Sequence, residues 1–239
     1  VPPVVQVRVG YLTRNTPASD VDFITYREYV GVSTTLLLFV ALTAPDVVCP
    51  DRRYRVLPLL FARPLTGGDY VAAKVGSIAF IVFGFSFLPQ VLLFIGQLLV
   101  ADDGALEYFT DNAEVLWQVP LAVAVLAIHY ACIGVALSAI TTRRVVAGVA
   151  ILAVALVTSA IAGIVSEVEA GEEQASAWMF VNILALPLHI RDLVFLGHVD
   201  PDGDLAGVAN AGLVVVLETV AIVAVCLLYL RRRYREVLS

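Results

Sequence analysis

The sequence has 239 residues, of which 60% are hydrophobic and 15% charged, with a formal net charge of −6 and a mean hydropathy of +0.89. Soluble domains carry about 25% charged residues, so this composition excludes an ordinary soluble domain and predicts a membrane protein. The acidic balance offers no footprint for nucleic acid. The three cysteines form no disulfide framework and no CxxC motif.

Five apolar stretches are long enough to cross a membrane as helices, for which about 20 residues are needed. Each is apolar around its whole circumference, which is typical of a membrane span and not of a surface helix. The sequence therefore predicts an all-α, polytopic transmembrane helix bundle, with residues 1–239 as one domain. The spans are expected at about 29–44, 75–100, 119–140, 145–166 and 211–230.

The connection between the first two spans is a basic, proline-broken interruption, RRYRVLPLLFARPLTGGDYVAAK (52–74). Val56–Ala62 is apolar but far too short to span, which predicts a short helix at the membrane surface or against another protein. Pro64 is expected to end that helix, since it disfavours helical geometry in the residue before it. Thr66–Gly68 then predicts a turn, and Asp69 an N-cap for the second span.

Charge divides the connections into two kinds. The connections at 101–118 and 167–209 are acidic, whereas the first connection, the third connection and the carboxyl terminus are basic. The positive-inside rule assigns the basic segments to the cytoplasm. With five spans this places the amino terminus outside, so we expect a further span upstream, six in all. The basic residues of these three segments are Arg52, Arg53, Arg55, Arg63, Lys74, Arg143, Arg144, Arg231, Arg232, Arg233 and Arg235.

Two outer segments are predicted to be helical without crossing the membrane. In 103–118 apolar residues recur at helical spacing between acids, which indicates an amphipathic helix at the interface. The region 177–196 is too polar to span, with Pro187, His189 and Arg191 near its middle. It predicts two short helices that dip into the outer face or lie on it.

Three polar residues fall inside predicted spans and are candidates for a substrate path: Glu218, His129 and Gln90. An ionisable residue within a span is a functional-site hypothesis by default. The alternative is structural for each of them. Glu218 would bond a neighbouring helix, His129 would be a satisfied packing residue, and Gln90 would join helices.

Catalytic signatures are absent from the sequence. It contains no GxxxxGK[ST] phosphate loop, no HExxH helix and no GxSxG turn, so we expect a protein that is not an enzyme. His189 and His198, with the acids of 200–204, favour a solvated acidic loop over a metal site. We expect no cofactor and no metal in this chain.

The stretch CPDRRYRVLPLLFARPLTGGDYVAAKVGS resembles the signature region of the permeases of type-2 ABC exporters, in the first cytoplasmic loop. The layout of spans and outer helices is similar as well, if one span lies upstream. The sequence departs from the pattern at 53–56, where many relatives have an acidic pair and Gly-Thr. The matching residues are Asp51, Arg52, Arg53, Leu57, Leu59, Ala62, Arg63, Pro64, Leu65, Asp69, Tyr70 and Lys74.

This resemblance implies an ATP-driven exporter of the cytoplasmic membrane, with loop 46–74 coupling the chain to a separate ABC ATPase subunit. That subunit would bind ATP and Mg. A second permease copy, or a related permease subunit, would complete the path through the lipid bilayer. The residues expected to contact the ATPase are Arg55, Leu57, Leu59, Leu60, Phe61, Arg63 and Pro64.

Other interpretations of the same residues stay open. The loop 46–74 could be an ordinary inner loop with anchoring charges. The chain could also be a membrane anchor or assembly subunit that holds a soluble enzyme at the inner face. A third interpretation is an ion-coupled transporter that uses Glu218 and His129.

Overall fold

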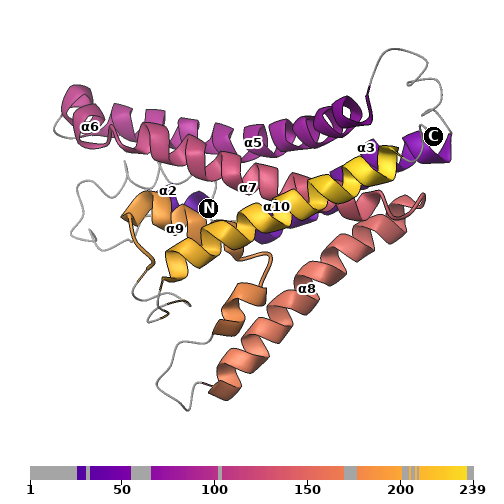
Figure 1. The fold of residues 1–239 in the computed structure, drawn as a ribbon. Coiled ribbons are helices and arrows are strands. Elements are labelled where there is room, and N and C mark those ends of the chain that lie inside the picture. Colours follow the sequence, from indigo (N-terminus) through magenta and orange to yellow (C-terminus); the bar gives the residue numbers. More distant parts are fainter. Residues whose placement is uncertain are drawn as a thin grey trace.

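A computed structural model describes residues 26–30, 33–54, 66–101, 104–169, 177–200 and 210–235, with 205 and 208. Within these ranges every regular element is a helix, which confirms the predicted all-α fold (Figure 1). The elements are α2 (Tyr26–Val30), α3 (Ser33–Arg53), α5 (Gly67–Val100), α6 (Ala105–Asp111), α7 (Val115–Ser138), α8 (Arg144–Glu169), the 3₁₀ helix η1 (Ala177–Val181), α9 (Leu186–Leu196) and α10 (Ala211–Arg235).

Five of these helices, α3, α5, α7, α8 and α10, are long and apolar enough to cross a membrane. This confirms the prediction of a multi-pass membrane protein, with five candidate spans among the residues that the structure describes. Four of the predicted spans coincide with α5, α7, α8 and α10 to within a few residues at the carboxyl ends, while the first begins and ends later than expected.

The helix α7 forms the centre of the bundle and packs against α3, α5, α8, α9 and α10. Val123, Leu126 and Ala127 on this helix are buried. Its glycine at position 134 lets α3 come close, because a Cβ there would lie 2.6 Å from Val40 Cγ1 and 3.0 Å from Ala44 Cβ. In contrast, α8 and α10 are largely exposed along their apolar faces, as expected for helices that face lipid.

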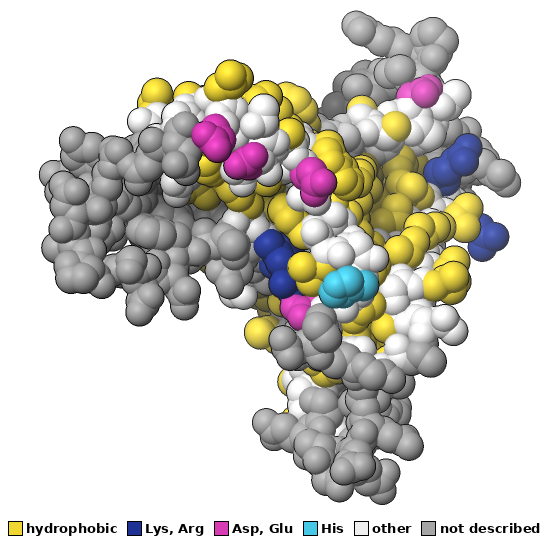
Figure 2. All heavy atoms as spheres, turned by 90° about the vertical axis from the view of Figure 1, so that its left-hand side faces the viewer, with side chains coloured by type: hydrophobic (Ala, Val, Ile, Leu, Met, Phe, Trp, Pro, Cys, Tyr) yellow, Lys and Arg dark blue, Asp and Glu magenta, His cyan; other side chains and the backbone are white. Residues whose placement is uncertain are grey.

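The spans alternate in direction, so that the basic segments meet at one end of the bundle. We call this the basic end: α3 and α10 finish there, α5 begins there, and the turn between α7 and α8 lies there (right-hand side of Figure 1). The opposite, acidic end carries α6, η1 and α9. Figure 2 looks onto the acidic end and shows acidic side chains (magenta) on the upper part of that face.

Helix α3 continues past the predicted end at Ala44 to Arg53, so that residues 46–53 of the predicted loop are helical. It does so although Pro45 and Pro50 lie inside it. Proline removes a backbone donor and normally breaks a soluble helix. In spans, neighbouring helices can supply the missing contacts, and here the last turns of α3 are bonded to the α7–α8 turn.

Helix α5 begins at Gly67, earlier than predicted, and its N-cap is Thr66. The prediction that Asp69 is the N-cap, after a turn at 66–68, is therefore wrong. Asp69 is instead the N3 residue of a capping box, the third residue of the helix. Its backbone N–H donates to Thr66 Oγ1 at 3.2 Å, and its carboxylate accepts from the Thr66 N–H at 2.9 Å. This reciprocal pair satisfies two helix-end donors, which a single cap at Asp69 would not.

The short elements of the acidic end follow the prediction in kind. The helix predicted within 103–118 is shorter than expected, since α6 ends at Asp111 and α7 takes over at Val115. The two short helices predicted within 177–196 are η1 and α9, with Pro187 in the first turn of α9. Proline is favoured at this position because the first-turn N–H has no partner within the helix.

Candidate functional site

The residues predicted to contact an ATPase, Arg55, Leu57, Leu59, Leu60, Phe61, Arg63 and Pro64, lie outside the described residues. The structure describes the chain on both sides of them, at the end of α3 and the start of α5. The candidate site is therefore formed by the two helix ends that flank the segment 55–65, together with the contacts that hold them. We call these two helix ends the roots of the segment.

Asp51, near the end of α3, joins the two roots directly. Its carboxylate accepts a hydrogen bond from the Tyr70 hydroxyl at 2.8 Å and forms an ion pair with Lys74 Nζ at 2.6 Å. Lys74 also donates to the Val47 carbonyl at 2.9 Å, and its ammonium lies 5.5 Å from the centre of the Tyr70 ring. One carboxylate thus links the last turn of α3 to the first two turns of α5.

The end of α3 is also bonded to the turn between α7 and α8. The Arg52 guanidinium donates to the carbonyl of Ala139 and, at 3.5 Å, to that of Thr141. The Cys49 thiol contacts the Ser138 and Thr141 carbonyls at 3.8 and 3.7 Å. Carbonyls at a helix carboxyl end lack partners within the helix and carry partial negative charge, so a cation such as Arg52 stabilises them.

Helix α10 reaches the same place through Tyr234. Its ring is 2% exposed and lies 4.8 Å from the Tyr70 ring, centre to centre. Its backbone passes close to Gly67, where a Cβ would meet the Tyr234 carbonyl at 3.4 Å. We call Asp51, Arg52, Tyr70, Lys74 and Tyr234 the root cluster.

Four of the five root-cluster residues belong to the motif that suggested the family resemblance: Asp51, Arg52, Tyr70 and Lys74. Residues at the two ends of the motif therefore contact one another, although up to 23 positions of sequence separate them. Arg53, another motif residue, points outward and is exposed. The sequence motif contains these residues but gives no sign that they bond to each other.

The root cluster joins the ends of several helices at the basic end. The side chains of Lys74 and Asp51 are 22% and 19% exposed, so their attraction is only partly screened by water. Through the cluster, α3, α5, α10 and the α7–α8 turn share contacts.

The three polar residues proposed for a substrate path lie on three different helices and have different surroundings. Gln90 on α5 is buried and its Nε2 donates to the Tyr26 carbonyl at 3.4 Å. His129 on α7 is buried with Nε2 at 3.0 Å from the Ile183 carbonyl. Glu218 on α10 is half-buried. Gln90 lines an apolar cavity of about 270 Å³ between α5 and α7, whose lining includes neither of the other two.

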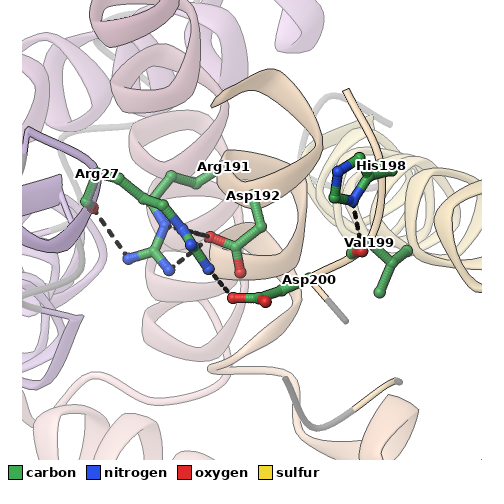
Figure 3. Close-up of polar contacts among 6 residues, drawn as sticks. All are labelled: Arg27, Arg191, Asp192, His198, Val199 and Asp200. Carbon is green, nitrogen blue, oxygen red and sulfur yellow. Dashed lines mark hydrogen bonds and ion pairs between the residues drawn. The ribbon is translucent and has the colours of Figure 1, made fainter. Parts of the chain in front are cut away.

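A charged network at the acidic end was not predicted (Figure 3). Arg27 of α2 pairs with Asp192 of α9 at 2.8 Å and with Asp200, and Arg191 pairs with Asp192 at 2.6 Å. Asp192, then Asp200, raise the pKa of the Arg27 guanidinium above its ordinary value. Arg27 and Asp192 are 165 residues apart, so no local pattern in the sequence could have paired them.

This network holds the first described turn of the chain against α9, and a further bond links it to α6. Arg191 also donates to the Arg27 carbonyl at 3.1 Å, and the Tyr26 hydroxyl lies 2.8 Å from that of Tyr108 on α6. Burial raises the pKa of Tyr26, and the bond to Tyr108 adds to the shift. The two arginines and two aspartates balance in charge, as partly buried ions must to offset their desolvation.

Among the described residues, no three His, Cys, Asp or Glu side chains lie close enough together to hold a metal ion. No family model matches the sequence, and no curated protein matches it. The class that the fold defines is a multi-pass, all-α membrane protein, whose described residues include five long apolar helices.

Proposed function

We propose that this chain is the membrane-spanning permease subunit of an ATP-driven ABC exporter in a cytoplasmic membrane. The segment 55–65 contacts a separate ATPase subunit on the cytoplasmic side, and a second copy or a related subunit completes the path. ATP and Mg bind to the ATPase and not to this chain.

The observation that carries the proposal is the root cluster. A segment that passes the movement of an ATPase to the spans must be held firmly to those spans. Asp51 fixes both roots of the segment 55–65 to each other, and Arg52 and Tyr234 extend the contact to the α7–α8 turn and α10. An ordinary inner loop with anchoring charges would need no such fixation.

The distribution of charge supports the cytoplasmic placement of this end. Most of the arginines, together with Lys74, lie at the basic end, which the positive-inside rule assigns to the cytoplasm along with the carboxyl terminus. An ATPase that uses cytoplasmic ATP would meet the chain on that side.

The rival transporter driven by an ion gradient has weaker support. A proton path through Glu218 and His129 would need side chains or water linking the two. The described contacts of His129 are with Ile183 and the Tyr130 ring, and Glu218 lies on α10. If transport follows a proton gradient without ATP and stops with Glu218→Gln, this rival is correct.

Co-purification tests the proposal. Replacing Leu59 and Phe61 by Asp places two charges on the predicted docking side of the segment. The double variant should lose at least about tenfold of the ATPase recovered with the tagged chain, because an apolar side chain placed in a groove contributes about 1.5–3 kcal/mol each. Membrane insertion should be unaffected.

The matched control is Leu106→Asp with Phe109→Asp, which makes the same change on α6 at the acidic end, where both side chains are exposed. This variant should keep the ATPase. Retention of the ATPase by the Leu59 and Phe61 variant, or equal loss in both variants, would show that the segment 55–65 is not the docking element.

A further inference from the structure

Beside the α7–α8 turn, the basic end contains a cavity of about 750 Å³ lined by Arg53, Arg143 and Arg144. All three side chains are exposed. Arg144 pairs with Asp46 at 3.0 Å, whereas neither Arg53 nor Arg143 has an ion-pair partner among the residues that the structure describes. The cavity therefore holds an excess of positive charge.

An apolar groove of about 310 Å³ leads away from this cavity between α3 and α8. Arg144 and Val145 line both, so the two lie side by side. Leu42, Val145 and Val149 on its walls are 67%, 78% and 58% exposed. The helices touch at its floor, where a Cβ on Gly148 would lie 2.8 Å from the Ala41 carbonyl oxygen.

The chemistry of the two parts is complementary to a single kind of molecule. Guanidinium groups bind phosphate oxygens through charge-assisted hydrogen bonds. On α3 the groove extends from Asp46 to Leu38, about 12 Å along the helix axis and into the apolar part of the span. A phosphate that carries an apolar chain matches both parts, whereas a free phosphate would leave the groove empty.

We infer that the cavity and groove are one binding site for an anionic phospholipid. The phosphate is held by Arg53, Arg143 and Arg144, and one acyl chain lies in the groove between α3 and α8. The site requires only that these two helices cross the membrane. It is thus independent of the proposed transport function, and its test can fail while that function stands.

A second copy of this chain is a poorer occupant of the same groove. A two-fold interface brings the same patch of each copy together. The arginines of one copy would then lie near those of the other, and among the described residues that line the cavity and groove Asp46 alone is acidic. A lipid phosphate neutralises this charge instead.

Native mass spectrometry of the full chain, with phosphatidylglycerol and phosphatidylcholine of equal acyl chains, tests the inference. The wild type should retain phosphatidylglycerol preferentially. Arg53→Gln with Arg143→Gln should weaken binding of phosphatidylglycerol at least about tenfold, since each arginine near an anionic lipid contributes about fivefold to the binding constant. The double Lys variant, which keeps the charge, should retain most of it.

Two further variants separate the lipid from other occupants. Val149→Trp fills the groove and should lower occupancy of phosphatidylglycerol while the arginines are intact. Arg232→Gln with Arg233→Gln removes two arginines of the same end, on α10, and should change nothing. All these side chains are exposed, and unchanged thermal unfolding shows that each variant is folded.

Three results would overturn the inference. Equal loss in the Arg232 and Arg233 variant would indicate general surface charge. Full displacement by excess inorganic phosphate, with no effect of Val149→Trp, would indicate a site for free anions. A disulfide-linked dimer formed by Leu42→Cys would indicate that a second copy covers the groove.

Discussion

Asp51 joins the end of α3 to the start of α5 through a single carboxylate. It lies on the last turn of α3 and accepts from both Tyr70 and Lys74 of α5. Because the pair with Lys74 is about four-fifths buried, loss of either partner leaves the other partly desolvated without compensation. The sequence indicated these residues through the motif, but their mutual contact depends on the antiparallel packing of two spans and has no local signal.

We predict that Asp51 and Lys74 are coupled in their contribution to the free energy of unfolding. In a double-mutant cycle with Asp51→Asn and Lys74→Met, thermal unfolding in detergent should give a coupling free energy of about 1–2 kcal/mol. Each single variant should lower the Tm by roughly 2–6 °C. A coupling near zero would mean that the ion pair does not fix the roots.

The exposed pair of Asp46 and Arg144 is the control for this cycle. Both side chains are more than half exposed, at 59% and 53%. Water and salt screen such a pair, so Asp46→Asn should change the free energy of unfolding by less than about 0.5 kcal/mol.

At the scale of elements, hydrophobicity alone predicted which segments cross the membrane, because a span must be apolar over about 20 residues. The ends of the elements were less predictable. The first span was expected to end at Ala44, but α3 continues through Pro45 and Pro50 to Arg53, and contacts with the α7–α8 turn hold its last turns. The capping box at Thr66 was visible in the sequence as Thr-x-x-Asp and was read as a turn.

Gly134 provides a test of the packing between α3 and α7. Gly134→Ala should destabilise the protein by about 1–3 kcal/mol, because the added Cβ would lie 2.6 Å from Val40 Cγ1 on a stiff β-branched side chain. Thermal unfolding in detergent measures the change. A glycine in the open, Gly84 of α5, has nothing within 4 Å of an added Cβ.

Gly84→Ala should accordingly leave stability unchanged or raise it by up to about 1 kcal/mol, the difference in helix propensity. If both substitutions have the same effect, the close approach of α3 and α7 at Gly134 is not a determinant of stability.

For the whole molecule, the main organising feature is the separation of a basic end from an acidic end. The sequence predicted it from the charge of the connections, and the alternating helices bring the basic segments together. The network of Arg27, Arg191, Asp192 and Asp200 could not be predicted, since it joins segments far apart in the sequence. The predicted ATPase contacts lie in the segment 55–65, outside the described residues, and stay a prediction.

The proposed contact between the segment 55–65 and an ATPase is tested most directly by photo-crosslinking in living cells. A single photoreactive residue is placed at position 60 in one variant and at position 109 in another. The first lies in the segment 55–65 and the second on α6 at the acidic end. We predict that the photoreactive residue at position 60 crosslinks to an ABC ATPase in an ATP-dependent manner and that the one at position 109 does not. A crosslink to the ATPase from position 109, or none from position 60 in cells that carry out the transport, would contradict the proposed contact.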